Sequence, residues 1–175
     1  MKTNLNYDMF VPTRTLFGAG TLNELHAQPM PGRKALLVIS NGRSTRANSY
    51  LSRTEEQLRM AGVETVLFDR VEANPLKSTV MAGGAMAREN GCDMIVALGG
   101  GSVMDAAKAI AVVASNGGDY WDYIPCGTGK GKAVAETPLP IVAITTTAGT
   151  GSETDAGCVI TNAETHEKTG FVHPG

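Results

Sequence analysis

The stretch that decides the fold covers residues 94–108 and reads MIVALGGGSVMDAAK. Five apolar residues predict a buried strand, three glycines follow, and an alanine-rich helix begins directly after them. Glycine lets the backbone turn sharply and approach a bulky anion, and the first amides of the helix then point at that anion with the positive end of the helix dipole behind them. The stretch therefore predicts a phosphate or pyrophosphate site at Gly99, Gly100, Gly101 and Ser102.

A capped helix start with free amides is expected at this turn. Ser102 is placed to cap the helix, and Asp105, three residues later, is placed to answer the cap. The amides of Gly100 to Val103 are expected to be free for a diphosphate. Three glycines that only make a tight turn are the less favoured alternative, because one glycine normally suffices. The spacing matches neither a Walker loop nor the G-x-G-x-x-G fingerprint, so the residues indicate a phosphate-bearing ligand and no more.

The rest of the chain alternates buried strands with helices. Runs rich in Val, Ile and Leu predict strands at residues 35–40, 63–69, 93–98 and 140–147, and helices are predicted at residues 50–61, 78–90 and 103–115. This alternation is typical of a parallel sheet that is covered on both faces. We therefore expect one α/β domain over residues 1–175, with a Rossmann-like parallel sheet flanked by helices.

Three further segments carry weaker patterns. Residues 11–17 have the composition of a strand. Thr21 and Glu24 have the spacing of a capping box, so a short helix is expected to begin there. Residues 121–134 mix Pro, Gly and Lys with little periodicity, which predicts a surface excursion.

Composition narrows the class of partner. The chain has 175 residues, a net charge of -2 and no cluster of Lys and Arg, which argues against nucleic acid or an anionic membrane as a partner. No segment has the roughly 18 apolar residues of a membrane span, and no secretory leader is recognisable. Cys92, Cys126 and Cys158 lie far apart and outside any C-x-x-C pair, so reduced thiols in a cytoplasmic protein are expected. A small-molecule ligand is favoured.

A second loop is rich in hydroxyl groups. Residues 145–153 read TTTAGTGSE and follow the last predicted strand. Ligands of open α/β sheets lie at this carboxyl end, and such a loop can hydrogen-bond an amide or a ribose. A plain surface turn of Ser, Thr and Gly is an equally open interpretation of this loop alone.

Together, the two loops resemble those of the iron-containing alcohol dehydrogenase family. The motifs GGGSxxDxxK at residues 99–108 and TTAGTGSE at residues 146–153 have the order and spacing of that family. The sequences FGAG at residues 17–20, Asn74-Pro75, and DAGCVITN at residues 155–162 extend the resemblance over nearly the whole chain. It implies the nucleotide-binding, dehydroquinate synthase-like N-terminal domain of a two-domain enzyme that interconverts an alcohol and its aldehyde or ketone.

The resemblance also implies roles around a nicotinamide dinucleotide. The pyrophosphate would be held by Gly99, Gly100, Gly101 and Ser102, with Asp105 at the position of the family's aspartate. The nicotinamide and its ribose would be lined by Thr146, Thr147 and Thr150. Two residues with weaker support, Asn74 and Lys168, would also lie near the cofactor.

The metal of the family is not expected on this chain. The resemblance implies a divalent iron, or zinc, held by one Asp and three His of a helical C-terminal domain, where it stabilises charge on the substrate oxygen. The histidines here, His26, His166 and His173, form no His-x-x-x-His or Asp-x-x-x-His pair. We therefore expect a truncated, cofactor-binding half that does not turn over alcohols by itself and that comes from a homo-oligomeric protein.

The choice of nicotinamide depends on the loop after the first strand of the sheet. NAD-specific relatives carry an acid there, which hydrogen-bonds the ribose 2′-hydroxyl. This chain has Ser40, Asn41 and Arg43 and no acid, and an Arg can bind a 2′-phosphate. NADP(H) is therefore favoured over NAD(H), with a solvated Arg43 as the alternative. A dehydroquinate synthase-like carbon-oxygen lyase and a stand-alone dinucleotide-binding module stay open as other functions.

Overall fold

The structure is a computed structural model that describes residues 11–173. Its main sheet is parallel, with strand order β2-β1-β3-β4, and consists of β1 (Lys34–Ser40), β2 (Glu64–Val71), β3 (Met94–Gly99) and β4 (Ile141–Thr145). The α-helices are α1 (Ser44–Ala47), α2 (Tyr50–Met60), α3 (Lys77–Glu89) and α4 (Gly101–Asn116). Two 3-10 helices, η1 (Thr21–Ala27) and η2 (Tyr120–Tyr123), and an antiparallel hairpin of β5 (Gly157–Asn162) and β6 (Glu167–Val172) complete it.

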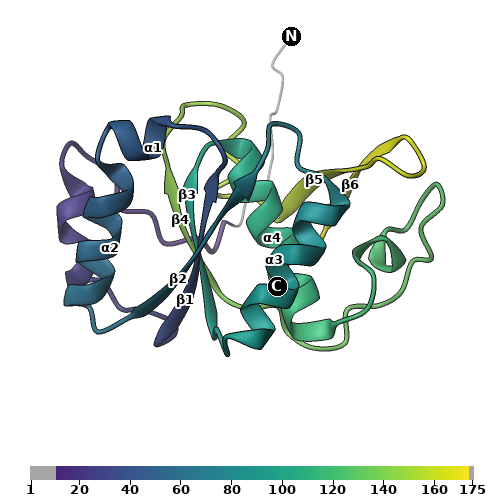
Figure 1. The fold of residues 1–175 in the computed structure, drawn as a ribbon, viewed down its shortest axis with the longest axis horizontal. Helices are drawn as coiled ribbons and strands as arrows, with labels where there is room; N and C mark the ends of the chain where they lie inside the picture. Colours follow the sequence, from purple (N-terminus) through teal and green to yellow (C-terminus); the bar gives the residue numbers. More distant parts are fainter. Residues whose placement is uncertain (1–10, 174–175) are drawn as a thin grey trace, which may run out of the picture.

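Helices cover both faces of the main sheet. Helix α2 lies on one side of the sheet, and α3 and α4 lie on the other (Figure 1). Along β1, Leu36 and Val38 belong to the core under α3 and α4, whereas Leu37 and Ile39 belong to the core under α2 and η1. Successive side chains of a strand point to opposite faces, so two covered faces require a continuous apolar run. The α/β class and the parallel sheet are therefore confirmed.

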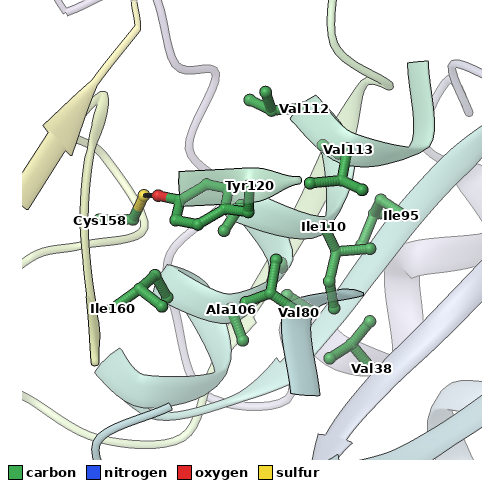
Figure 2. Close-up of a cluster of buried hydrophobic side chains, with 14 of the residues drawn as sticks. Val38, Val80, Ile95, Ala106, Ile110, Val112, Val113, Tyr120, Cys158 and Ile160 are labelled. Atoms are coloured by element: carbon green, nitrogen blue, oxygen red, sulfur yellow. Dashed lines mark hydrogen bonds between the residues drawn. The ribbon is translucent and has the colours of Figure 1, made fainter. Parts of the chain in front are cut away.

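The larger core lies between the sheet, α3, α4 and the hairpin. Ile110 and Val113 of α4 lie beside Ile95 of the sheet, and Tyr120 and Cys158 close the opposite side of the cluster (Figure 2). The hydroxyl of Tyr120 lies 3.3 Å from the Cys158 sulfur. Both groups are buried, and burial raises the pKa of the Cys158 thiol to about 11. Cys158 is thus a core residue.

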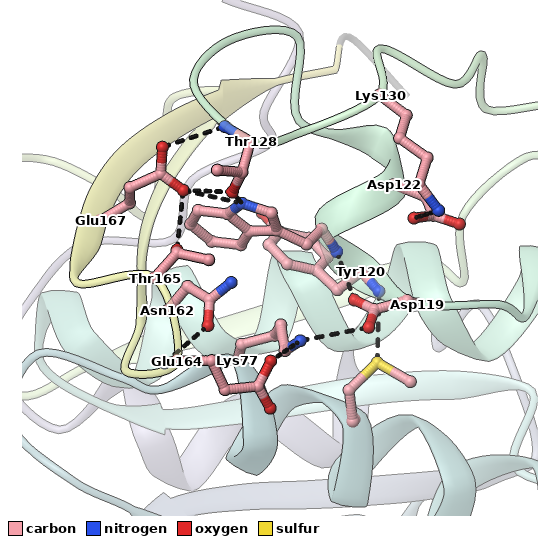
Figure 3. A network of polar contacts seen from close by, with 12 residues as sticks. Lys77, Asp119, Tyr120, Asp122, Thr128, Lys130, Asn162, Glu164, Thr165 and Glu167 are labelled. Carbon is pink, nitrogen blue, oxygen red and sulfur yellow. Dashed lines mark hydrogen bonds and ion pairs between the residues drawn. The ribbon is translucent and has the colours of Figure 1, made fainter.

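A polar network ties the β5–β6 hairpin to η2 (Figure 3). The carboxylate of Glu167 accepts hydrogen bonds from the Thr128 amide at 2.9 Å and the Trp121 indole at 3.3 Å. Hydrogen bonds from Thr128 and from the Thr165 hydroxyl hold the pKa of Glu167 below its ordinary value. The prediction of a surface excursion over residues 121–134 is wrong at its beginning, because Trp121 and Tyr123 are buried and η2 packs against the core.

All the predicted strands and helices of the main sheet are present, with bounds that differ by a few residues. Residues 11–17 do not form the predicted strand, because within residues 11–173 no neighbouring strand takes their backbone hydrogen bonds. A helix begins at Thr21 as expected, but it is a 3-10 helix that starts from a left-handed Gly20 and lacks a side-chain cap. The Thr21 hydroxyl instead donates to the carbonyl of Gly18. In the described part of the chain, no helix is both long and apolar enough to cross a membrane.

Candidate functional site

The glycine turn joins β3 to α4 at the carboxyl edge of the sheet. Gly100 is the N-cap residue of α4 and has an extended backbone. Within residues 11–173, the amides of Gly100, Gly101 and Ser102 have no hydrogen-bond acceptor. The expectation of a free amide at Val103 is wrong, because this amide donates to the Gly100 carbonyl at 2.9 Å. Three unpaired amides at the positive end of a 16-residue helix therefore form the turn.

The protein's own packing crowds two of the three glycines, Gly99 more tightly than Gly100. A Cβ added to Gly99 would lie 2.6 Å from Cγ2 of Val103, and one added to Gly100 would lie 3.0 Å from Oγ1 of Thr147. A Cβ on Gly101 would meet only Thr150, at an ordinary 3.6 Å. Close internal packing therefore accounts for Gly99 and Gly100, and only Gly101 has side-chain space that the described protein atoms leave open.

The threonine loop, residues 145–153, lies beside the glycine turn, residues 99–101. Strand β4 runs parallel to β3 with Gly99 opposite Thr145, so the segments that follow the two strands emerge side by side. The amide of Thr146 donates to the Gly99 carbonyl at 2.9 Å. Thr146, Thr147 and Thr150 are all exposed, so their hydroxyls can reach a ligand at the free amides. The sheet thus brings together two loops that lie more than forty residues apart in the sequence.

Asn74 and Lys168 extend the site from the other direction. Asn74 has a left-handed backbone with φ of 58°, a conformation that Asn tolerates better than most residues. Its amide donates to the Ser102 hydroxyl at 3.4 Å, and its side-chain oxygen accepts from the Lys168 ammonium at 2.7 Å. Lys168 lies on β6, so the hairpin supplies a cation beside the start of α4.

The loop after β1 lies at the same edge of the sheet. β1 is the neighbour of β3, and Ser40 is its last residue. The Asn41 amide donates to the Val71 carbonyl at 2.8 Å, which fixes the beginning of the loop. Arg43 is exposed and precedes α1, and within residues 11–173 it forms no ion pair. Ser40, Asn41 and Arg43 therefore lie one strand away from the glycine turn.

The expected cap at the start of α4 is wrong. Ser102 lies inside the helix, and no side chain caps the N-terminus. Asp105 does not answer a cap, because its carboxylate accepts from the Ser152 hydroxyl at 2.7 Å and from the Val159 amide at 3.1 Å. Helix α4 begins after Gly100 without a side-chain cap. The Asp105 carboxylate can therefore accept hydrogen bonds from residues on the hairpin side of α4.

Sequence reasoning missed the role of Lys108 and Ser152. The Lys108 ammonium donates to the Ser152 hydroxyl, to the Asp155 carboxylate and to the Gly157 carbonyl, at 3.0, 2.8 and 2.7 Å. Ser152 is buried, with 4% of its surface exposed. A signal was present, because positions 105 and 108 lie one turn apart on one face of the helix. Their partners, however, are more than forty residues away in the sequence.

No metal centre forms in the described part of the chain. Among residues 11–173, no three His, Cys, Asp or Glu side chains gather closely enough to hold a metal ion. His26 lies beside Gln57, His166 is exposed in the hairpin turn, and His173 stacks on Phe171. These residues do not fit a metal, so no chemical step through a metal is assigned to them.

Comparisons with known proteins agree on one family. The family model described as iron-containing alcohol dehydrogenase matches residues 12–175. The chain is 39% identical over 165 residues to the 1,3-propanediol dehydrogenase of Klebsiella pneumoniae, and the match covers 93% of this chain and 41% of that protein. It is 38% identical over 169 residues to the probable NADH-dependent butanol dehydrogenase 1 of Bacillus subtilis (strain 168), with 97% of this chain and 42% of that protein covered.

A solved structure gives the same result. The archaeal halo-thermophilic Red Sea brine pool alcohol dehydrogenase ADH/D1 superposes with a TM-score of 0.87 at 39% identity, over 96% of this chain and 43% of that one. The chain spans about two fifths of the length of the curated relatives it matches. Fold and motif order therefore correspond to a part of these proteins.

Proposed function

Because the chain belongs to the iron-containing alcohol dehydrogenase family, we propose that it supplies the nicotinamide dinucleotide site of an enzyme that interconverts an alcohol and its aldehyde or ketone. The observation that carries the proposal is the set of unpaired amides at Gly100, Gly101 and Ser102, with the exposed threonine loop beside them. A diphosphate satisfies such amides and the positive end of α4 together.

The remaining site residues suit the two ends of a dinucleotide. The glycine turn would hold the pyrophosphate, and the Lys168 ammonium, which donates to Asn74, would offset part of its charge. Ser40, Asn41 and Arg43 at the end of β1 would hold the adenosine ribose. The threonine loop would hold the nicotinamide ribose and amide, because its hydroxyls can donate to and accept from both.

When bound, the dinucleotide accepts or donates a hydride. The residues of this chain bind and orient it: amides grip the diphosphate, and the threonine loop holds the nicotinamide end. Orientation matters because a fixed reactive geometry removes much of the entropic barrier to reaction.

We propose further that NADP(H) binds more tightly than NAD(H). Arg43 is exposed, forms no ion pair within residues 11–173, and follows a β1 end without an acid. The carboxylate of Asp69 on β2 is engaged by Arg46 at 2.6 Å, which reduces its repulsion of a 2′-phosphate. Several curated relatives are NADH- or NAD-dependent by name, so the preference rests on the loop of this chain alone.

Fluorescence titration with NADPH and NADH tests both proposals. The wild-type chain is expected to bind NADPH about tenfold more tightly, since one charge-assisted phosphate contact contributes roughly 1.5 kcal/mol. Arg43→Ala is expected to remove that difference and to leave NADH binding unchanged. Arg59→Ala is the control, because Arg59 pairs with Glu56 on the exposed face of α2. Equal affinities in the wild type would refute the NADP(H) preference, and no binding of either nucleotide would refute the cofactor site.

A further inference from the structure

We propose that Asp105 and Lys108 are positioning residues that hold the threonine loop over the glycine turn and do not touch the dinucleotide. The inference rests on the proposed function, and it gives Asp105 a role different from the cofactor contact that its motif predicts. It concerns residues 146–156, the segment that connects β4 to β5.

The first support is the direction of the Asp105 side chain. Both of its carboxylate oxygens are engaged on the hairpin side of α4, one by the Ser152 hydroxyl and the other by the Val159 amide. A carboxylate and a diphosphate repel each other, and Asp105 gains nothing by facing one. Its two acceptors instead fix the end of the threonine loop and the middle of β5.

The second support is the saturation of Lys108. An ammonium group has three donors, and its three partners are Ser152, Asp155 and the Gly157 carbonyl. Its side chain is only 17% exposed. Lys108 therefore has no donor left for a phosphate, and its charge is already opposed by Asp155 at 2.8 Å.

The third support is the way the loop is attached. Thr146 is tied to the Gly99 carbonyl at the start of the loop, and Ser152 is tied to Asp105 and Lys108 at its end. Both attachments lie on the continuous β3–α4 unit that also carries the free amides. Between them, Thr147 and Thr150 are exposed, and their hydroxyl oxygens would lie 3.0 and 3.6 Å from a Cβ added to Gly100 and to Gly101, respectively. The distance between hydroxyls and amides thus depends on the attachment at Ser152.

A comparison of two ligands separates positioning from phosphate binding. NADPH spans the glycine turn and the threonine loop, whereas ADP carries the diphosphate without a nicotinamide end. Lys108→Met removes one charge-assisted anchor of the threonine loop and leaves the free amides of the glycine turn intact. It is therefore expected to weaken NADPH binding about tenfold and to change ADP binding less than about twofold. Lys108→Arg keeps the cation and is expected to restore most of the NADPH affinity. Lys130→Met, at an ion pair on the exposed excursion, is the control.

Hydrogen exchange adds a readout that needs no ligand. In Lys108→Met, the hydrogen-bonded amides of Thr146, Thr154 and Gly157 are expected to exchange faster, whereas those of β3 keep their wild-type rates. Asp155→Ala removes the most exposed partner of Lys108 and is expected to weaken NADPH binding less than Lys108→Met does. This second variant tests the proposal even if Lys108→Met does not fold.

Each outcome separates the hypotheses. Equal losses for NADPH and ADP would assign Lys108 to the diphosphate and overturn the positioning role. Unchanged NADPH affinity in both Lys108→Met and Asp155→Ala would also overturn it and would leave the cofactor site standing. Absence of NADPH and ADP binding in the wild type would overturn the proposed function and, with it, this inference.

Discussion

Adding one methyl group at each position of the glycine turn is expected to produce a graded loss of stability. The three substitutions are Gly99→Ala, Gly100→Ala and Gly101→Ala, and none of the three glycines has a positive φ that alanine would avoid. The difference between them therefore comes from what the new Cβ meets. The structure gives these neighbours for each position.

Gly99→Ala is expected to be the most costly. Its Cβ would lie 2.6 Å from Cγ2 and 2.8 Å from Cβ of Val103, and the latter atom is fixed to the backbone of α4. The turn itself has to shift, so we expect a loss near the upper end of the roughly 1–3 kcal/mol typical of overpacking.

Gly100→Ala and Gly101→Ala are expected to be milder. The Cβ at position 100 would meet the side chain of Thr147 at 3.0 and 3.3 Å, and this exposed residue can move at a cost of about 1 kcal/mol. The Cβ at position 101 has ordinary clearance, and helix propensity favours alanine by roughly 0.5–1 kcal/mol. Gly101→Ala should therefore be as stable as the wild type or slightly more stable.

Urea unfolding followed by fluorescence measures the series. Trp121 is the single tryptophan and is buried, so its emission reports loss of the core. With a slope of about 2 kcal/mol per molar urea, a loss of 2 kcal/mol lowers the midpoint by about 1 M. Thr147→Ala is expected to abolish the cost of Gly100→Ala in a double-mutant cycle. A wild-type midpoint for Gly99→Ala, or the largest loss at Gly101→Ala, would refute the steric reasoning.

Two predictions concern the core. Gly83→Ala is expected to destabilise the chain by about 1–3 kcal/mol despite better helix propensity, because its Cβ would lie 2.5 Å from Cδ1 of Ile110. Ile110→Val should recover part of this loss in urea unfolding. Full additivity of the two substitutions would contradict the contact. Burial raises the pKa of the Cys158 thiol from 9.0 to about 11, so the folded chain keeps this proton to higher pH than the unfolded chain. Its contribution is complete below pH 9 and is lost as pH rises through about 11, which is expected to lower the unfolding free energy by about 2–3 kcal/mol. Cys158→Ala should show a smaller loss over the same range, although Tyr120, whose pKa burial also raises, adds to it in both proteins; identical pH profiles would remove the assignment to Cys158.

Much of the fold could be predicted because its signals are local. Residues 35–39 of β1 and 94–98 of β3 are all apolar since helices cover both faces of the sheet, so the run itself marks a buried strand. Gly99 to Gly101 mark the turn into α4 by an equally local signal, because strand, glycines and helix follow one another directly. The carboxyl edge then brings the threonine loop and the loop after β1 to the same place, as parallel strands require.

Two of the errors share one cause, which is dependence on a distant partner. Residues 11–17 have a strand-like composition, but a strand needs a neighbour to take its hydrogen bonds, and none pairs with them in the described chain. Trp121 lies in a segment rich in turn residues, yet Glu167, 46 positions later, accepts its indole N–H in the network beside the core. The composition of a segment does not show whether a distant partner exists for it.

The sequence by itself determined the order of strands and helices, the glycine turn and the family, because each follows from residues that are adjacent or regularly spaced along the chain. Only the tertiary structure decided which way Asp105 points, why a side chain is more costly at Gly99 than at Gly101, and what holds the threonine loop. Helical spacing places Asp105 and Lys108 on one face of α4. What that face meets depends on how β5 and its preceding loop pack across the molecule, and packing between distant segments leaves no local pattern in the sequence.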